Sequence, residues 1–87
     1  MRLLGKSRLN ALDDIDRDTH VWISAWIAEL SNANWRDEES MLDAFPRAMP
    51  SEGVLYSFPV CGKNSLLIKI AVHFNRGTAV IKEVVYK

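Results

Sequence analysis

The most constraining feature of the chain is a set of three β-rich runs within residues 54–86. In the middle run every second residue is apolar, which places five side chains on one face of a strand: Leu66, Ile68, Ile70, Val72 and Phe74. The opposite face is mixed and carries Leu67, Lys69, Ala71 and His73. One apolar face beside one mixed face is typical of a sheet that helices cover on one side only.

Two short glycine-containing segments, 61–64 and 75–77, separate the three runs. Gly and Asn tolerate the positive φ angles that hairpin turns need. Because short turns make neighbouring strands antiparallel, we expect a three-stranded meander. The last run, residues 78–86, has apolar residues on both faces, and its faces stay unassigned at this point.

The first half of the chain predicts helices. Residues 1–4 are a candidate strand, and residues 8–16 a candidate short helix. The clearest helix is His20–Asn32, capped by Asp18 or Thr19, with an apolar stripe that should pack on the sheet. That stripe includes Trp22, Ile23, Trp26, Ile27 and Leu30.

A third short helix should follow Asp37 as its N-cap, with Met41, Leu42 and Phe45 as its apolar positions. Pro46 ends this helix, and residues 46–53 form the longest loop. Residues 1–87 thus predict a single α+β domain of order β-α-α-(short α)-β-β-β, with a small antiparallel sheet and helices on one face.

Composition limits the setting. The chain has 87 residues and one cysteine, Cys61, so it forms no intramolecular disulfide and fits a reducing cytoplasm. No apolar run approaches the roughly 20 residues of a membrane span. Net charge is zero, but residues 1–50 carry −3 and residues 51–87 carry +3. A polyanion would prefer the sheet half, although ordinary surface scatter also explains this imbalance.

Motifs that carry chemistry are few. The only His and Cys residues, His20, His73 and Cys61, lack metal-ligand spacing, and no glycine-rich phosphate loop is present. We therefore expect no metal and no cofactor. Basic and hydrogen-bonding residues gather on or beside the sheet: Lys63, Asn64, Lys69, His73, Arg76, Lys82, Tyr86 and Lys87. They suit phosphate binding or acid–base RNA cleavage, while packing of His73 and solubilising lysines are the alternative explanation.

Several segments match a family pattern in order. The run from Trp22 to Ala48 has a tryptophan-bearing helix and then Trp35 followed by the Phe45-Pro46-Arg47-Ala48 segment. The sheet follows with Phe58-Pro59-Val60-Cys61-Gly62-Lys63-Asn64 and Ile70-Ala71-Val72-His73-Phe74. With the opening Met1 to Leu9, this pattern covers nearly the whole chain and resembles the HigB-type toxins of the RelE superfamily.

The resemblance implies a toxin of a type II toxin–antitoxin system, a ribosome-dependent mRNA endoribonuclease that inhibits translation in the cytoplasm. Its partners would be a cognate antitoxin protein, forming a hetero-oligomer, and mRNA on the ribosome. His73, Lys69 and Lys82 would then be catalytic without a metal. Five further residues would bind RNA: Lys63, Asn64, Arg76, Tyr86 and Lys87.

The chain also departs from the family pattern. Leu66 and Leu67 stand where the family has an aromatic residue and an arginine, and Lys82 stands where it has a last-strand arginine. Lysine keeps the charge but not the bidentate phosphate geometry. The family's closing segment has no counterpart after Tyr86. These departures favour a second hypothesis, a catalytically impaired module that binds an antitoxin protein or RNA without cleavage.

Overall fold

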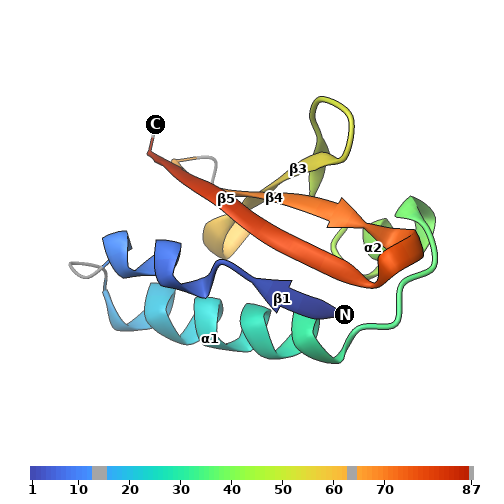
Figure 1. Cartoon of the computed structure of the whole chain (residues 1–87). Helices are drawn as coiled ribbons and strands as arrows, with labels where there is room; N and C mark the ends of the chain where they lie inside the picture. Colours follow the sequence, from blue (N-terminus) through green and yellow to red (C-terminus); the bar gives the residue numbers. More distant parts are fainter. Residues whose placement is uncertain (13–15, 63–64, 87) are drawn as a thin grey trace.

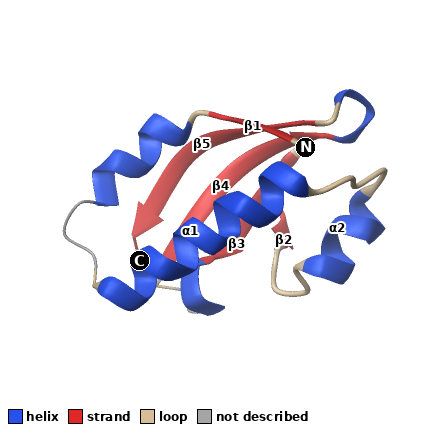
Figure 2. Cartoon of the chain, turned by 90° about the horizontal axis from the view of Figure 1, so that it is seen from below, coloured by secondary structure: helices blue, strands red, loops and turns tan. Residues whose placement is uncertain are grey.

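The computed structural model describes the backbone of residues 1–12, 16–62 and 65–86 and has an α+β fold (Figure 1). In chain order its elements are β1 (Arg2–Leu4), the 3₁₀ helix η1 (Lys6–Leu12), α1 (Arg17–Asn32), α2 (Glu38–Ala44), β2 (Met49–Pro50), β3 (Leu55–Pro59), η2 (Val60–Gly62), β4 (Leu66–His73), η3 (Phe74–Arg76) and β5 (Thr78–Tyr86). Figure 2 shows α1 lying across one face of the sheet. None of the described helices is long and apolar enough to cross a membrane.

The sheet has five strands in the order β1-β5-β4-β3-β2. Strands β3, β4 and β5 form the expected antiparallel meander. The expectation of a purely antiparallel sheet of four strands was wrong, because β1 runs parallel to β5 and the expected loop 46–53 contains β2. A short strand such as β1, which is joined to the next strand by a long helical connection, can pair in either direction. A strand of two residues, such as β2, is too short to show an alternation of apolar and polar side chains.

The start of α1 differs from the expected start at His20. Asp16, and not Asp18 or Thr19, is the N-cap, since its Oδ1 accepts a hydrogen bond from the Thr19 backbone N–H at 2.7 Å. Before it, the expected α-helix of residues 8–16 is instead the 3₁₀ helix η1, and residues 13–15 lie outside the described residues. The short helix α2 and its Asp37 cap are confirmed: Oδ1 accepts from the Ser40 N–H at 2.9 Å, which lowers the pKa of that carboxyl.

The core lies between the sheet and the helices, and the apolar face expected for β4 is confirmed. The fully buried large side chains come from α1, α2 and strands β3 to β5: Trp26, Leu30, Met41, Phe58, Ile68, Ile70, Val72 and Ile81. Trp35, in the connection before α2, packs edge-to-face on Phe45, with ring centroids 5.8 Å apart. Val54, which precedes the first residue of β3, is 44% exposed.

A β-bulge explains why β5 is apolar on both faces. Ile70 of β4 pairs with Ile81, but the preceding Lys69 pairs with Glu83, so Lys82 is an extra residue in β5. Ala79 and Ile81 face the core before the bulge, and Val84 packs against the core after it. The alternation therefore shifts by one residue at Lys82, a shift that a strict two-residue period cannot reveal.

Candidate functional site

The sheet face opposite α1, which we call the open face, holds two of the three predicted catalytic residues. Lys69 and His73 alternate with the core residues of β4, as expected, and both are half-buried. Four residues apart on one strand, they are separated by about 13 Å. They therefore lie on the same face but are too far apart to act on one phosphate group together without movement of their side chains.

His73 stands at one end of a row that crosses three strands. It pairs with Thr78 of β5, and Thr78 pairs with Arg2 of β1. Neighbouring positions in such a row have their Cβ atoms about 5 Å apart, so these three side chains start from the same end of the open face. We call these three residues the His73 row.

The turn between β4 and β5 adds another cation beside the His73 row. Arg76 lies in η3 and is exposed, and Gly77 follows with φ +62°, a left-handed conformation that favours glycine. The Arg2 backbone N–H donates to the Gly77 carbonyl at 2.7 Å, which joins β1 to this turn. Arg76 thus lies three residues after His73, in the turn at the same end of β4.

Lys69 sits in a different environment. Its Nζ lies 3.6 Å from the Glu83 Oε1 of the paired position on β5, with side chains 34% and 58% exposed. An exposed pair of this kind stabilises the fold by at most about 1 kcal/mol. It nevertheless places a carboxylate beside the ammonium group, which weakens the attraction of Lys69 for a phosphate.

The other predicted residues are spread along the sheet. Lys82 is exposed at the bulge, in the middle of β5. Tyr86 is 61% exposed and pairs with Leu66 at the far end from His73. The predicted RNA-binding residues Lys63, Asn64 and Lys87 lie outside the described residues. His73 and Arg76 therefore lie at one end of β4. Lys69 and Lys82 lie in the middle of the sheet, and Tyr86 lies at the other end.

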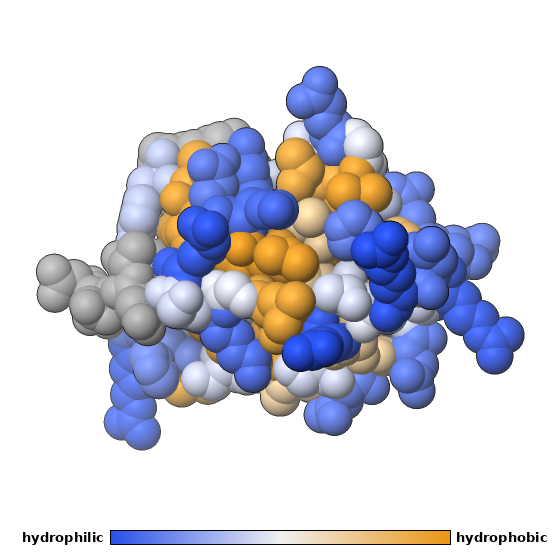
Figure 3. All heavy atoms as spheres, viewed as in Figure 1, coloured by the Kyte–Doolittle hydropathy of each residue, from blue (hydrophilic) through white to orange (hydrophobic). Residues whose placement is uncertain are grey.

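The open face is more apolar than the sequence suggested. Leu67 and Ala71, which share this face of β4, are each only 3% exposed. Leu4 at the edge is 40% exposed. Figure 3 looks onto the edge of the sheet, with β5 and β1 in front and α1 below, and shows apolar surface at the centre of the view bordered by hydrophilic groups. Lys69, in the middle of this face, thus lies between two buried apolar side chains of β4.

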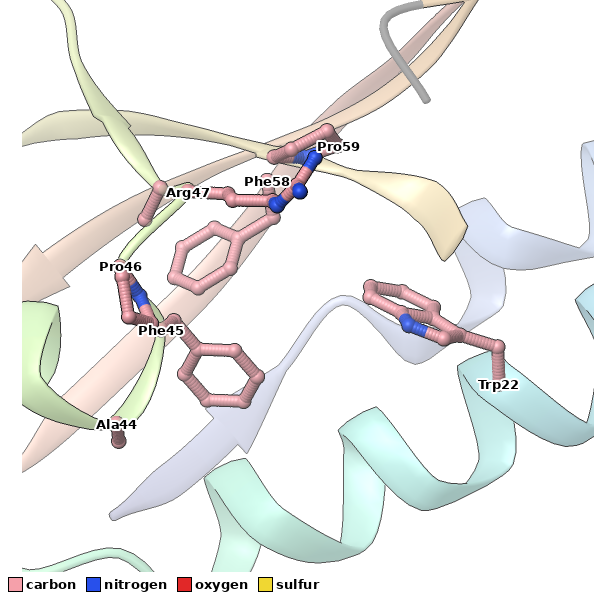
Figure 4. Close-up of a pocket in the computed structure, with 8 residues that line it drawn as sticks. Trp22, Ala44, Phe45, Pro46, Arg47, Phe58 and Pro59 are labelled. Carbon is pink, nitrogen blue, oxygen red and sulfur yellow. The ribbon is translucent and has the colours of Figure 1, made fainter. Parts of the chain in front are cut away.

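A second candidate site lies on the helical side. The segment that follows α2 turns back on itself, with the Ala48 N–H donating to the Phe45 carbonyl at 3.0 Å. It forms one wall of a cleft of about 250 Å³, the aromatic cleft, shown in Figure 4. Residues of α1, this segment and β3 line the cleft: Trp22, Ala44, Phe45, Pro46, Arg47, Ala48, Phe58 and Pro59.

The walls of the aromatic cleft belong to a connected set of rings. Phe45 contacts Phe58 edge-to-face at 5.3 Å between centroids, and Phe58 contacts Trp26 at 5.6 Å. Trp26 in turn stacks on Trp22 at 6.3 Å. Such a cleft suits an apolar side chain of a partner better than a phosphate. Of the predicted catalytic and RNA-binding residues that the structure describes, none lines it.

One titratable group between α2 and β3 has a shifted pKa. Burial, together with a hydrogen bond to Glu38 and the charge of that carboxylate, raises the pKa of Tyr56 above its usual value. This contact ties α2 to β3.

Among the described residues, no group of three or more His, Cys, Asp or Glu side chains is arranged to hold a metal ion.

Sequence reasoning missed Arg2 and Thr78. Both join the site only because β1 pairs with β5, and no pattern in three residues predicts that partner.

No protein-family description and no curated protein matches the chain. The resemblance to HigB-type toxins therefore rests on the residues that carry it and stays a prediction.

Proposed function

We propose that this chain is the RelE-like toxin of a toxin–antitoxin pair, a cytoplasmic endoribonuclease that cleaves mRNA on the ribosome and that a cognate antitoxin protein silences in a hetero-oligomer. The single observation that carries this proposal is the His73 row with Arg76 beside it. It combines one residue that can move protons with two arginines, one in β1 and one in the β4–β5 turn, at one end of the sheet.

The chemistry requires no metal. In the proposed reaction neutral His73 takes the proton of an RNA 2′-hydroxyl, the 2′-oxygen attacks the adjacent phosphorus, and the 5′-oxygen of the next nucleotide leaves with a proton. Arg2 and Arg76 would hold the extra negative charge of the phosphorane. Lys69 and Lys82 are farther along the sheet and would contact neighbouring phosphates, while a water molecule would supply the proton to the leaving oxygen.

The test is induced expression in bacteria with primer extension on abundant mRNAs. The proposal predicts growth arrest with new in-frame 5′ ends, suppressed by the protein encoded next to the toxin. His73→Ala should reduce cleavage by about 100-fold or more, the usual contribution of a positioned acid or base. His73→Ala with Lys82→Ala should relieve the arrest completely.

The control for these variants is Arg17→Gln, an exposed arginine at the start of α1 on the other side of the molecule. It removes one positive charge without touching the His73 row. Growth arrest that persists in the His73→Ala, Lys82→Ala protein at equal soluble expression would remove these residues from the mechanism. Relief of arrest by Arg17→Gln would show that total charge matters rather than this site.

A non-catalytic binding module is the second candidate, and two observations favour it. Glu83 partly neutralises Lys69, and the family-like Phe45-Pro46-Arg47-Ala48 segment lines a cleft suited to protein contacts rather than to RNA. This candidate predicts tight binding to an antitoxin protein with intact mRNA and normal growth at confirmed soluble expression. Primer extension therefore separates the two candidates directly.

A further inference from the structure

A hollow at the edge of the sheet, which we call the arginine hollow, lies between the start of β1, the β4–β5 turn and the α1–α2 connection. Its volume is about 570 Å³. Met1, Arg2, Ala33, Asn34, Trp35, Arg36 and Gly77 line it. Two guanidinium-bearing residues and one amide-bearing residue are thus among the lining residues, and no acidic residue is.

The backbone around the arginine hollow is fixed from three sides. The Met1 amino group donates to the backbone carbonyls of Ser31 and Ala33 at the end of α1. The Arg2 N–H donates to the Gly77 carbonyl. Trp35, next to Arg36, packs on Phe45. Strand β1, the turn and the connection therefore hold the two arginines around one concave surface.

The charges of the two arginines are not compensated within the described chain. Both residues are exposed, and across residues 1–12, 16–62 and 65–86 neither has an ion-pair partner. Guanidinium groups bind phosphate oxygens through paired, charge-assisted hydrogen bonds. The volume falls in the range of small-ligand pockets and leaves room for more than the phosphate itself.

We propose that the arginine hollow is a phosphate-binding subsite, in which Arg36 holds the phosphate and Asn34 donates a further hydrogen bond, with the charge of Arg2 at the border of the hollow. This site goes beyond the proposed cleavage site, and its binding does not depend on RNA being cut. Arg2 belongs to the edge strand β1. It is one of the three residues of the His73 row, and it also lines the hollow. An RNA strand on the open face could therefore continue over the sheet edge into the hollow.

The test is an NMR titration of ¹⁵N-labelled protein with inorganic phosphate, matched by sodium chloride at equal ionic strength. The expected result is saturable shifts of the Gly77 and Arg36 amides with phosphate alone. Arg36→Gln should weaken this binding by roughly tenfold or more, the effect of losing a charge-assisted pair. Arg17→Gln, with the same charge loss, should leave it within about twofold of wild type.

Equal shifts with chloride, or unchanged phosphate affinity in Arg36→Gln, would overturn the proposal. The amide spectrum of Arg36→Gln should keep wild-type dispersion, because Arg36 is exposed in a connection. If it does not, phosphate affinity is compared between the wild type and Arg36→Lys, which keeps the positive charge but not the bidentate geometry of the guanidinium group. Arg36→Lys should weaken phosphate binding.

A second arm distinguishes the sources of the phosphate. A short oligoribonucleotide with a 5′-phosphate is compared with the same oligonucleotide carrying a 5′-hydroxyl and with inorganic phosphate. Tighter binding of either oligonucleotide at the Arg36 amide assigns the hollow to RNA, whereas equal affinity for inorganic phosphate assigns it to the free ion. Phosphate binding without any RNA cleavage would contradict the proposed function but would support the phosphate-binding subsite.

Discussion

The two faces of the sheet are built from the same strands but differ in their side chains: one face forms the core, and the other carries the candidate site. On the covered face, Ile68, Ile70 and Val72 of β4 are almost fully buried against aromatic rings from α1 and β3. On the open face, the same strand presents Lys69 and His73, which are half-buried and have neighbours on β5 that are polar or charged. Stability should therefore depend on the covered face, and function on the end of the open face.

The largest expected effect comes from Trp26, which links both halves of the core and is 1% exposed. Trp26→Ala should lower the free energy of unfolding by about 3–5 kcal/mol, measured by urea denaturation, because it leaves a large cavity. His73→Ala on the open face should change it by less than about 1 kcal/mol. Similar losses for both variants would break the contrast between the faces.

A matched variant refines this prediction. The Trp26 indole N–H is buried without a hydrogen-bond partner among the described residues. Trp26→Phe loses volume but also removes this unsatisfied donor, so it should cost clearly less than Trp26→Ala. An equal cost for both variants would show that the indole N–H has a partner, such as a buried water.

The second effect concerns the strand that brings Arg2 to the site. Gly5 has φ +82°, and a Cβ added there would lie 2.7 Å from the Ile81 carbonyl oxygen. Gly5→Ala should cost at least about 2 kcal/mol, since left-handed strain of about 1–2 kcal/mol adds to a backbone clash. Gly53→Ala, with φ +58° and no neighbour within 4 Å, should show the strain alone.

Urea midpoints of the two glycine variants give the measurement. If Gly5→Ala is no worse than Gly53→Ala, β1 does not lie close to Ile81, and the parallel pairing that completes the His73 row is in doubt. Amide exchange of the Arg2 N–H, which is hydrogen-bonded to Gly77, reports the same contact independently.

The third effect is pH-dependent and belongs to the covered face. The folded state holds the Tyr56 proton more tightly than the unfolded state, whose pKa is near 10.0. The unfolded chain therefore releases this proton first, and stability should fall as the pH rises above about 10. Tyr56→Phe should flatten this alkaline loss in urea midpoints at pH 8 to 11, and Glu38→Gln should reduce it. An unchanged slope in Tyr56→Phe would contradict the contact.

The smallest effect is expected on the open face. Lys69→Ala and Glu83→Ala should each change stability by less than about 1 kcal/mol, with a coupling in the double-mutant cycle that shrinks in high salt. Glu83→Ala should at the same time strengthen RNA binding, because it removes a carboxylate beside Lys69. Weaker RNA binding in Glu83→Ala would show that the pair positions Lys69 rather than masking it.

The strongly periodic parts of the fold were predictable from the sequence. The alternation in β4 assigned its core face correctly, and the tryptophan stripe of α1 located the covering helix. In both cases burial repeats with the period of the element, so several residues agree on one orientation. The Asp37 cap was also predictable, because Asp is a strong N-cap residue and Glu38 and Glu39 follow it in the first turn.

The parts that depend on partners far along the chain were not predictable. The bulge at Lys82 and the parallel pairing of Arg2 with Thr78 arise from the register between strands, and neither leaves a local pattern. The candidate site combines both kinds of residue. Its histidine, Arg76 and the separation of Lys69 from His73 could be proposed from the sequence, whereas Arg2 and Thr78 required the sheet order.

The most direct test maps RNA onto the two faces by NMR, with a short oligonucleotide whose 2′-hydroxyls are replaced by 2′-O-methyl groups so that it is not cleaved. The account predicts saturable shifts at Arg2, His73 and Thr78 and none at Val21, Ala25 and Ala28, which are exposed on the outside of α1. Shifts confined to α1, or none at the His73 row at saturating RNA, would contradict it.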